Sequence, residues 1–305
     1  MLTASVVIYN TPKPQIESLF RSVRNSKSIN HFYVIDNAPT DENRVCFESC
    51  EIASIIEYIP HENTGYGSSH NVAIHKAIEE GSDYHVVLNP DIYFEQNVLA
   101  ELINYMDSNH EVGYVLPKVT YPDGELQFLC KLLPTPFDLI FRRFLPKTKL
   151  LTKINDRYEL RMSGYDKIMN PPCLSGCFMF MRLSTLKEHN LFFDDGYFMY
   201  CEDFDLIRRI HRVTKTVYYP NVSIVHDHAK ASYKSRKMLK AHIKSAIRYF
   251  NKWGWIFDKE RKQMNKKILE EIKEMNTQNT RGGVRKYSII QTEPCFADLP
   301  ARRVA

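Results

Sequence analysis

Short β-branched apolar segments alternate with helical segments over the first 119 residues, and this alternation limits the possible folds more than any other feature. A short run of such residues is typical of a strand, whereas apolar residues that recur on one helical face indicate a helix. The expected strands are 5–9, 32–36, 52–59, 85–88 and 112–119, and the expected helices follow Pro14 or span 68–80 and 96–106. The pattern predicts a doubly wound α/β sheet.

Polar residues follow several of these strands. They are Asn10 after the first strand, Asp36 and Asn37 after the second, and Asn89 and Asp91 after a later one. In doubly wound sheets, ligands bind beyond the carboxyl ends of the strands. We therefore expect a nucleotide site at this edge, although Asp36 alone is equally consistent with a turn or a helix cap.

A glycine-containing loop, NTGYGSSHN at residues 63–71, leads into the helix expected at 68–80. Its glycines let the backbone approach a ligand, and Ser68 or Ser69 can cap a helix whose amino terminus favours anions. The spacing is neither that of a dinucleotide-binding motif nor that of a P-loop. A dinucleotide enzyme and an NTPase are therefore not indicated.

Two segments have side chains suited to a divalent cation. In HVVLNPDIYF, Asn89 and Asp91 are two positions apart at a strand end, so they point to the same side and can share a cation and its diphosphate. In isolation, Asn-Pro-Asp would indicate only a turn. In VSIVHDHAKAS, His226 and His228 have the same spacing at another strand end, and such a pair favours metal binding.

The acidic cluster Glu202-Asp203-Phe204-Asp205 follows an aromatic run and is expected at a helix entrance. Apolar surroundings raise the pKa of a carboxyl group, which suits a general base. Interaction with the helix dipole would explain Asp205 alone. No nucleophile elbow with its Ser, Asp and His is visible, which argues against a hydrolase.

The rest of the chain is less regular. Residues 121–172 are rich in proline and predict a long excursion or a flexible flap. Strands are expected at 173–181 and 216–225, and a short helix from Ser184.

The net charge of +5 is concentrated late in the chain, where residues 234–275 hold 13 Lys and Arg against 5 Asp and Glu. Residues 233–275 therefore predict a basic amphipathic helical region that meets an anionic surface and no nucleic acid. Residues 276–305 are polar and then irregular, which is consistent with either a disordered tail or a segment partly foreign to the natural protein.

The seven cysteines form an odd set without zinc-knuckle spacing, which predicts reduced thiols. The first residues lack the pattern of a signal peptide, and no uncharged apolar run approaches the ~20 residues of a membrane span. A cytoplasmic protein, neither secreted nor transmembrane, is expected.

Seven segments, taken together and in order, resemble the family 2 glycosyltransferases and, among these, the bacterial rhamnosyltransferases of O-antigen synthesis. They are SVVIYN, VIDNAPTD, NTGYGSSHN, VVLNPDIYF, LSGCFMFMR, GYFMYCEDFDL and VHDHAKAS, spread over residues 3–232. The resemblance implies a GT-A fold, with a doubly wound mixed sheet of Rossmann-like type. Residues 1–119 would bind the nucleotide sugar, residues 120–232 would form the acceptor and catalytic half, and a helical appendage would follow.

The resemblance also implies roles for the matching residues. Asp203, with Glu202 beside it, would be the base that deprotonates the acceptor. Asp91 and His226 would bind Mg²⁺ or Mn²⁺, although Asn89 replaces the first Asp of the family's metal motif and makes the metal requirement less certain. The acceptor loop would contain Ser175 and Gly176, and the nucleotide-sugar site would contain Tyr9, Asn10, Asp36, Asn37, Asn63, Gly65, Asn71, Asn89 and Asp91.

The implied reaction is an inverting sugar transfer to a glycan or a polyprenyl-diphosphate-linked acceptor. The expected donor is dTDP-rhamnose, with a UDP-hexose as the alternative. The enzyme would meet the anionic inner face of the plasma membrane through lysines, arginines, Trp253, Trp255 and Phe257. The alternative for the helix itself is that it packs Leu239, Ile243 and Phe250 on the catalytic domain and leaves its basic face in solvent. A nucleotidyltransferase is less consistent, because no Gly- and Arg-rich loop follows the first strand. A noncatalytic glycan-binding scaffold is the remaining alternative.

Overall fold

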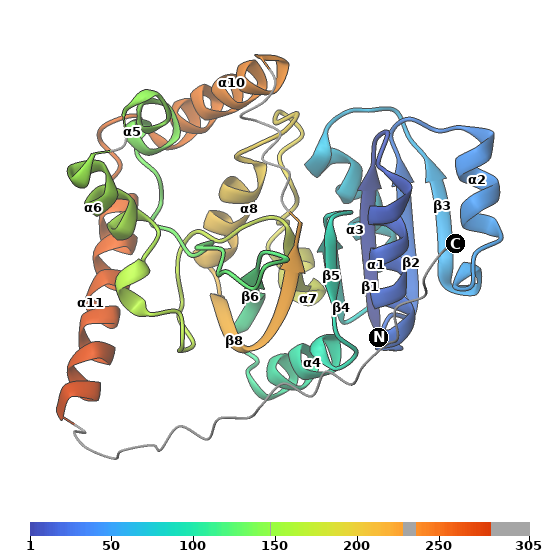
Figure 1. Cartoon of the computed structure of the whole chain (residues 1–305), viewed down its shortest axis with the longest axis horizontal. Helices are drawn as coiled ribbons and strands as arrows, with labels where there is room; N and C mark the ends of the chain where they lie inside the picture. The colour runs from blue at the N-terminus through green and yellow to red at the C-terminus, as the bar shows by residue number, and fades with distance from the viewer. Residues whose placement is uncertain (147, 228–235, 282–305) are drawn as a thin grey trace, which may run out of the picture.

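One mixed sheet forms the centre of the molecule. The computed structural model describes residues 1–146, 148–227 and 236–281, and in these residues eight strands are ordered β3-β2-β1-β4-β7-β6-β8-β5 (Figure 1). The strands are β1 Leu2–Ile8, β2 His31–Asp36, β3 Ile56–Pro60, β4 Tyr84–Leu88, β5 Ile92–Phe94, β6 Val112–Thr120, β7 Phe178–Arg182 and β8 Lys215–His226. The predicted doubly wound mixed sheet is confirmed.

The first four strands are parallel, and helical crossovers join them. The residues of β1, β2 and β4 are buried almost without interruption, as expected for parallel strands covered on both faces, whereas those of the edge strand β3 are half-buried or exposed. β7 then runs antiparallel between β4 and β6. This reversal brings the loop before β7 to the edge at which β1, β2 and β4 end.

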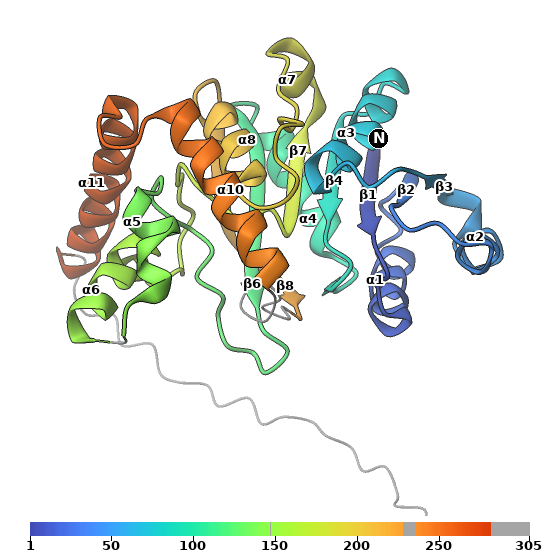
Figure 2. The same ribbon diagram turned by 90° about the horizontal axis from the view of Figure 1, so that it is seen from above.

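Helices cover both faces of the sheet. They are α1 Lys13–Ser26, α2 Asp41–Glu48, α3 Tyr66–Glu79, α4 Val98–Ser108, α5 Pro136–Leu139, α6 Lys149–Tyr158, α7 Leu183–Glu188, α8 Glu202–His211, α10 Arg236–Trp253 and α11 Lys259–Arg281. α3 packs on β1 and β2, and α8 packs on β6 and β8. Seen from above, α11 lies with α5 and α6 at one end of the molecule, α10 runs from that end toward the middle, and α2 lies at the other end (Figure 2).

Some boundaries differ from the sequence prediction. Residues 53–55, expected in a strand, form a 3-10 turn whose amides donate to carbonyls of residues 50–52, so the ladder begins only at Ile56. Residues 173–177, also expected in a strand, form a loop that precedes β7. Residues 121–172 contain α5 and α6 and bury the rings of Tyr158 and Tyr165, so this excursion is packed against the body.

The C-terminal region consists of α10 and α11, which we call the C-terminal helices. Residues 276–281, expected in the tail, continue α11, whereas residues 282–305 lie outside the described residues. None of the helices in the described residues is long and apolar enough to cross a membrane. The described cysteines are all free thiols.

Candidate active site

The carboxyl ends of β1, β2 and β4 lie side by side at one edge of the sheet. The strand registers place Ile8 opposite Asp36 and Val6 opposite Leu88. The polar residues that follow these three strands therefore meet at this edge. An edge of this kind is where doubly wound sheets bind their ligands.

Asp36 closes β2 and is fully buried. Its Oδ1 accepts a hydrogen bond from the Ala38 amide at 2.9 Å. Its Oδ2 accepts from Asn43 Nδ2 at 2.9 Å and from the Tyr58 hydroxyl at 2.8 Å. Burial and the Asp36 carboxylate raise the pKa of Tyr58, so this hydroxyl remains a donor. Asp36 thus fixes the turn after β2, which is the turn role given above as the alternative to nucleotide binding. Its partners Asn43 and Tyr58 were not indicated by the sequence.

Tyr9, Asn10 and Asn63 are the more accessible of the predicted nucleotide residues. Tyr9 is 55% exposed, Asn10 is exposed with a left-handed φ of 50°, and Asn63 is half-buried in the loop before α3. Asn37 is buried and exchanges hydrogen bonds of 2.8 and 3.1 Å with Ser69 of α3. The three accessible residues can contact a ligand, while Asn37 ties β2 to α3.

Gly65 begins α3 where this helix meets the segment that precedes α8. A Cβ at position 65, where φ is 121°, would lie 2.5 Å from the carbonyl oxygen of Phe198. The amide of Tyr66 donates to the same oxygen at 2.9 Å. Asn71 is buried, and its side-chain amide bonds to the Phe193 backbone at 2.9 and 3.0 Å. Gly65 and Asn71 therefore join the nucleotide edge to the acidic segment.

Tyr66 links the Asn-Pro-Asp segment to the loop before β7, a role that the sequence did not indicate. Its hydroxyl lies 2.8 Å from Asn89 Oδ1 and 3.1 Å from the Gly176 carbonyl oxygen. The backbone amide of Asn89 also donates to the Cys177 carbonyl at 2.9 Å. Asn89 is thus held in place by the loop before β7.

Asp91 and His226 form the group best suited to a divalent cation at this edge. Asp91 Oδ1 is buried and lies 3.4 Å from His226 Nε2. Gln127 orients the imidazole, since its Oε1 lies 3.0 Å from His226 Nδ1 and its Nε2 donates to the His226 carbonyl at 2.7 Å. Burial lowers the pKa of His226, but the Cys177 thiol and the Asp91 carboxylate outweigh it and raise the pKa to about 10.

This donor set fits Mg²⁺ or Mn²⁺. The Asp91 carboxylate faces an imidazole nitrogen of His226, and Gln127 fixes that ring through its other nitrogen, as is usual for metal-binding histidines. Because Asp91 raises the pKa of His226, a cation held by this pair would take the place of the imidazole proton. Gln127 lies in the irregular excursion, where periodicity provides no signal for it. His228, the second histidine of the predicted pair, lies outside the described residues.

Glu202 and Asp203 open α8, as the sequence predicts for a helix entrance. Asp203 Oδ2 accepts from the Gly176 amide at 3.0 Å, and its Oδ1 accepts from the Phe204 amide at 2.9 Å. Burial raises the pKa of Asp203 in spite of these two donors. Burial and the Asp203 charge raise the pKa of Glu202 well above its usual value, and Glu202 Oε2 is buried without a partner. Asp203 is the more exposed of the two, so it is the one that a hydroxyl can reach.

The predicted acceptor loop touches this carboxylate directly. A Cβ at Gly176 would lie 2.8 Å from the Asp203 Cβ, so only glycine allows the loop to approach so closely. The hydroxyl of Ser175 accepts from the Cys177 amide at 3.3 Å and closes the turn. The structure therefore brings Gly176 and Asp203 together, as expected for an acceptor loop beside a base.

A strained turn precedes α8. Tyr200 and Cys201 are consecutive non-glycine residues in the left-handed region, with φ of 70° and 65°. Each such residue costs roughly 1–2 kcal/mol and persists only where its surroundings hold it. This turn sets the direction in which Glu202 and Asp203 leave the backbone.

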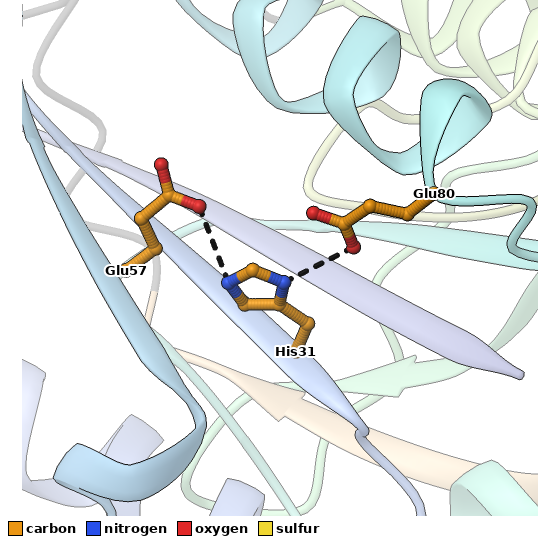
Figure 3. Close-up of side chains that lie close together, drawn as sticks. All are labelled: His31, Glu57 and Glu80. Carbon is orange, nitrogen blue, oxygen red and sulfur yellow. Dashed lines mark hydrogen bonds and ion pairs between the residues drawn. The ribbon is translucent and has the colours of Figure 1, made fainter.

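A second group of possible metal ligands lies elsewhere. His31 is placed between Glu80, 3.1 Å from its Nδ1, and Glu57, 3.3 Å from its Nε2 (Figure 3). Lys76 pairs with the other oxygen of Glu57 at 2.9 Å. His31 begins β2, whereas Asp36 ends it, so this group lies at the opposite edge of the sheet and takes no part in the site described above.

Around the loop before β7, the structure thus brings together the half-buried Asp203 carboxylate, the residues that follow the parallel strands and the Asp91–His226 pair. Residues 3–189 match the model of the family described as "Glycosyl transferase family 2", which is more than half of the chain. The chain therefore belongs to glycosyl transferase family 2, and the expected family and GT-A fold are confirmed.

Individual relatives agree with this assignment. The chain is 29% identical over 208 residues to the rhamnosyltransferase WbbL of Escherichia coli (strain K12), a match that covers 66% of this chain and 75% of WbbL. The structure of S. aureus TarS 1-349 in complex with UDP matches with a TM-score of 0.56 and 14% identity, over 88% of this chain and 70% of that chain. GalNAc-T7 with UDP, GalNAc and Mn²⁺ matches with a TM-score of 0.57 and 14% identity, over 86% and 48%. These two likenesses show the fold.

Proposed function

We propose that this glycosyltransferase transfers L-rhamnose from dTDP-rhamnose, with inversion at the anomeric carbon, to a glycan or a polyprenyl-diphosphate-linked acceptor of a bacterial surface polysaccharide. The observation that carries the proposal is Asp203, a half-buried carboxylate of raised pKa that accepts a hydrogen bond from the Gly176 amide of the predicted acceptor loop. The likeness to a rhamnosyltransferase supports the choice of sugar. In this proposal, residues 1–119 bind the donor, residues 120–232 bind the acceptor, and the C-terminal region is an appendage.

The chain's own residues account for the chemistry. As the acceptor oxygen bonds to the anomeric carbon, the bond from that carbon to the diphosphate breaks and Asp203 takes the hydroxyl proton. Glu202 keeps its own proton because burial and the Asp203 charge raise its pKa. Tyr9, Asn10 and Asn63 bind the nucleotide at the sheet edge. When held by Asp91 and His226, a divalent cation offsets the charge that grows on the leaving diphosphate.

A panel of nucleotide sugars tests this function. We expect dTDP-rhamnose to raise the midpoint of thermal unfolding most, because a bound donor stabilises the folded state in proportion to its occupancy. Product analysis should then find a nucleoside diphosphate and an inverted glycoside. Release of pyrophosphate would identify a nucleotidyltransferase instead, and the absence of any donor turnover would favour a noncatalytic scaffold.

A UDP-hexose is the second candidate donor. It is favoured by the matched structures of TarS and GalNAc-T7, which contain UDP. Turnover of UDP-glucose or UDP-galactose, without turnover of dTDP-rhamnose, would establish this alternative.

We also propose that the turn between α10 and α11 meets an anionic bilayer. Ile256 and Phe257 are 70% and 89% exposed there, and lysines of both helices flank them. Trp253, expected at the headgroups, is instead engaged with α8, because its Nε1 donates to Asp205 at 2.8 Å. Interfacial binding should require anionic lipid and weaken with salt.

Vesicle co-sedimentation tests this contact. Phe257→Ser should lower binding to anionic vesicles, whereas Val45→Ser should not, since Val45 is 62% exposed on α2 at the opposite end of the molecule. Equal binding of both variants, or equal binding to neutral vesicles, would contradict the proposal.

A further inference from the structure

The strained turn before α8 is held mainly by α10. Buried side chains of the two segments, together with one residue of α5, form a second apolar cluster, separate from the main core. Its members are Leu139, Tyr197, Cys201, Ala246, Tyr249 and Phe250. In addition, Ser245 Oγ of α10 donates to the Met199 carbonyl at 2.7 Å. The left-handed pair at 200 and 201 therefore persists because α10 packs on it.

The first turn of α8 is held by the end of α10. Asp205, two residues after Asp203, is fully buried. Its carboxylate accepts from Trp253 Nε1 at 2.8 Å and from Lys252 Nζ at 2.8 Å. Arg209 of the same helix adds a third donor at 2.9 Å. Two of the three donors to this buried charge thus come from α10.

The next turn of α8 is held by the start of α11. Arg208 is 1% exposed, and its two terminal nitrogens each donate to one Asp258 oxygen at 2.8 Å. Glu260 accepts from the same guanidinium at 2.6 Å. The guanidinium also lies over the Trp253 ring, 4.1 Å from its centroid. Trp253 therefore contacts both anchored residues of α8.

We infer that the C-terminal helices, which lie outside the residues matched to the family, position the catalytic carboxylate, and that Trp253 is the central positioning residue. The inference rests on the proposed role of Asp203 as base. Trp253 does not touch the reacting atoms. It acts through Asp205 and Arg208, which fix α8 so that Asp203 meets the Gly176 amide at 3.0 Å. A shift of about 1 Å in a catalytic group can cost as much as hundredfold in rate.

Two matched substitutions separate positioning from general packing. Trp253→Phe removes the Nε1 donor to Asp205 and keeps an aromatic ring under Arg208. Trp255→Phe makes the same chemical change in the same region, but its Nε1 donates only to Asn251, at 2.9 Å. Both are assayed with a soluble acceptor, so that vesicle binding plays no part.

We expect Trp253→Phe to lower kcat about tenfold while the donor KM stays within about twofold, because donor contacts are made elsewhere. Trp255→Phe should match the wild type in both constants. Lys252→Met, which removes the second donor from a half-buried position, gives a milder version of the same loss if Trp253→Phe folds poorly. Equal kcat for Trp253→Phe and Trp255→Phe would overturn the inference.

Hydrogen exchange provides a readout that does not need turnover. The Gly176 and Phe204 amides donate to Asp203, so Trp253→Phe should speed their exchange and Trp255→Phe should not. Unchanged protection in Trp253→Phe overturns the positioning role even if the donor is never found. A wild-type enzyme that turns over no donor, together with faster exchange in Trp253→Phe, would instead refute the proposed function and leave the positioning of Asp203 supported.

Discussion

Replacing Gly176 by alanine tests whether the acceptor loop places the base. The new Cβ would lie 2.8 Å from the Asp203 Cβ and 3.2 Å from its Oδ2. Non-bonded carbons prefer about 3.5–4.0 Å, so the two must separate by about 1 Å. Gly176 is buried and Asp203 is half-buried, so neither can move freely into solvent. The 3.0 Å hydrogen bond from the Gly176 amide to Asp203 must therefore lengthen or bend.

We expect Gly176→Ala to lower kcat by about tenfold to hundredfold, since a misplacement of this size moves the proton-accepting group. The donor KM should change less than kcat, because Asn89 is the predicted nucleotide residue that is bonded to this loop, through Tyr66 and the Cys177 carbonyl. Overpacking should also cost about 1–3 kcal/mol of unfolding free energy. Steady-state kinetics and denaturant unfolding measure the two effects.

Gly124→Ala is the control for a loss of folding stability that does not displace the base. Gly124 has a φ of 87°, and a Cβ at this position would meet no other atom within 4 Å. Alanine there adds backbone strain of about 1 kcal/mol without moving Asp203. It should reduce stability and leave kcat unchanged. Wild-type kcat in Gly176→Ala, or an equal loss in Gly124→Ala, would refute the argument.

Two further predictions concern the acidic residues. Asp203→Asn should lower transfer by at least about hundredfold and keep donor affinity. Because burial raises the pKa of Asp203 above 3.8, the kcat of the wild type should fall on acidification at a pH higher than an ordinary carboxyl group would give, as pH-dependent kinetics would show. Above that pKa the variant should be more stable than the wild type, since it does not bury a charge, as pH-dependent unfolding would show. Asp91→Ala and His226→Ala should weaken donor binding in the presence of Mg²⁺ or Mn²⁺, as calorimetry would measure. If a chelator leaves the donor affinity of the wild type unchanged, the metal role is contradicted.

The sequence located the strand-end and helix-end residues because periodicity shows where elements stop. Asn89, Asp91, Asp203 and His226 all follow from such ends, and they do lie at strand or helix termini. Their mutual distances were not predictable, because strand order is decided by packing. The antiparallel insertion of β7, which brings Gly176 to Asp203, has no local signature.

Residues that orient the site from a distance were missed for a related reason. Gln127 bonds to a histidine 99 positions away, and it lies in a proline-rich segment without periodicity. Asp205 was attributed to the helix dipole, but its buried carboxylate is bound by α10, 47 and 48 positions further along the chain. Such contacts depend on how helices dock, which composition and spacing do not encode.

The contact between Gly65 and Phe198 limits how this enzyme can be recombined. The proposed donor half and the proposed acceptor half meet there at backbone distance, since any side chain at 65 would collide with the Phe198 carbonyl. A chimera that takes its first half from a relative with a larger residue at this position would force the two halves apart before any substrate binds. Exchange of donor or acceptor specificity between relatives should therefore succeed only where the incoming half keeps glycine at this position.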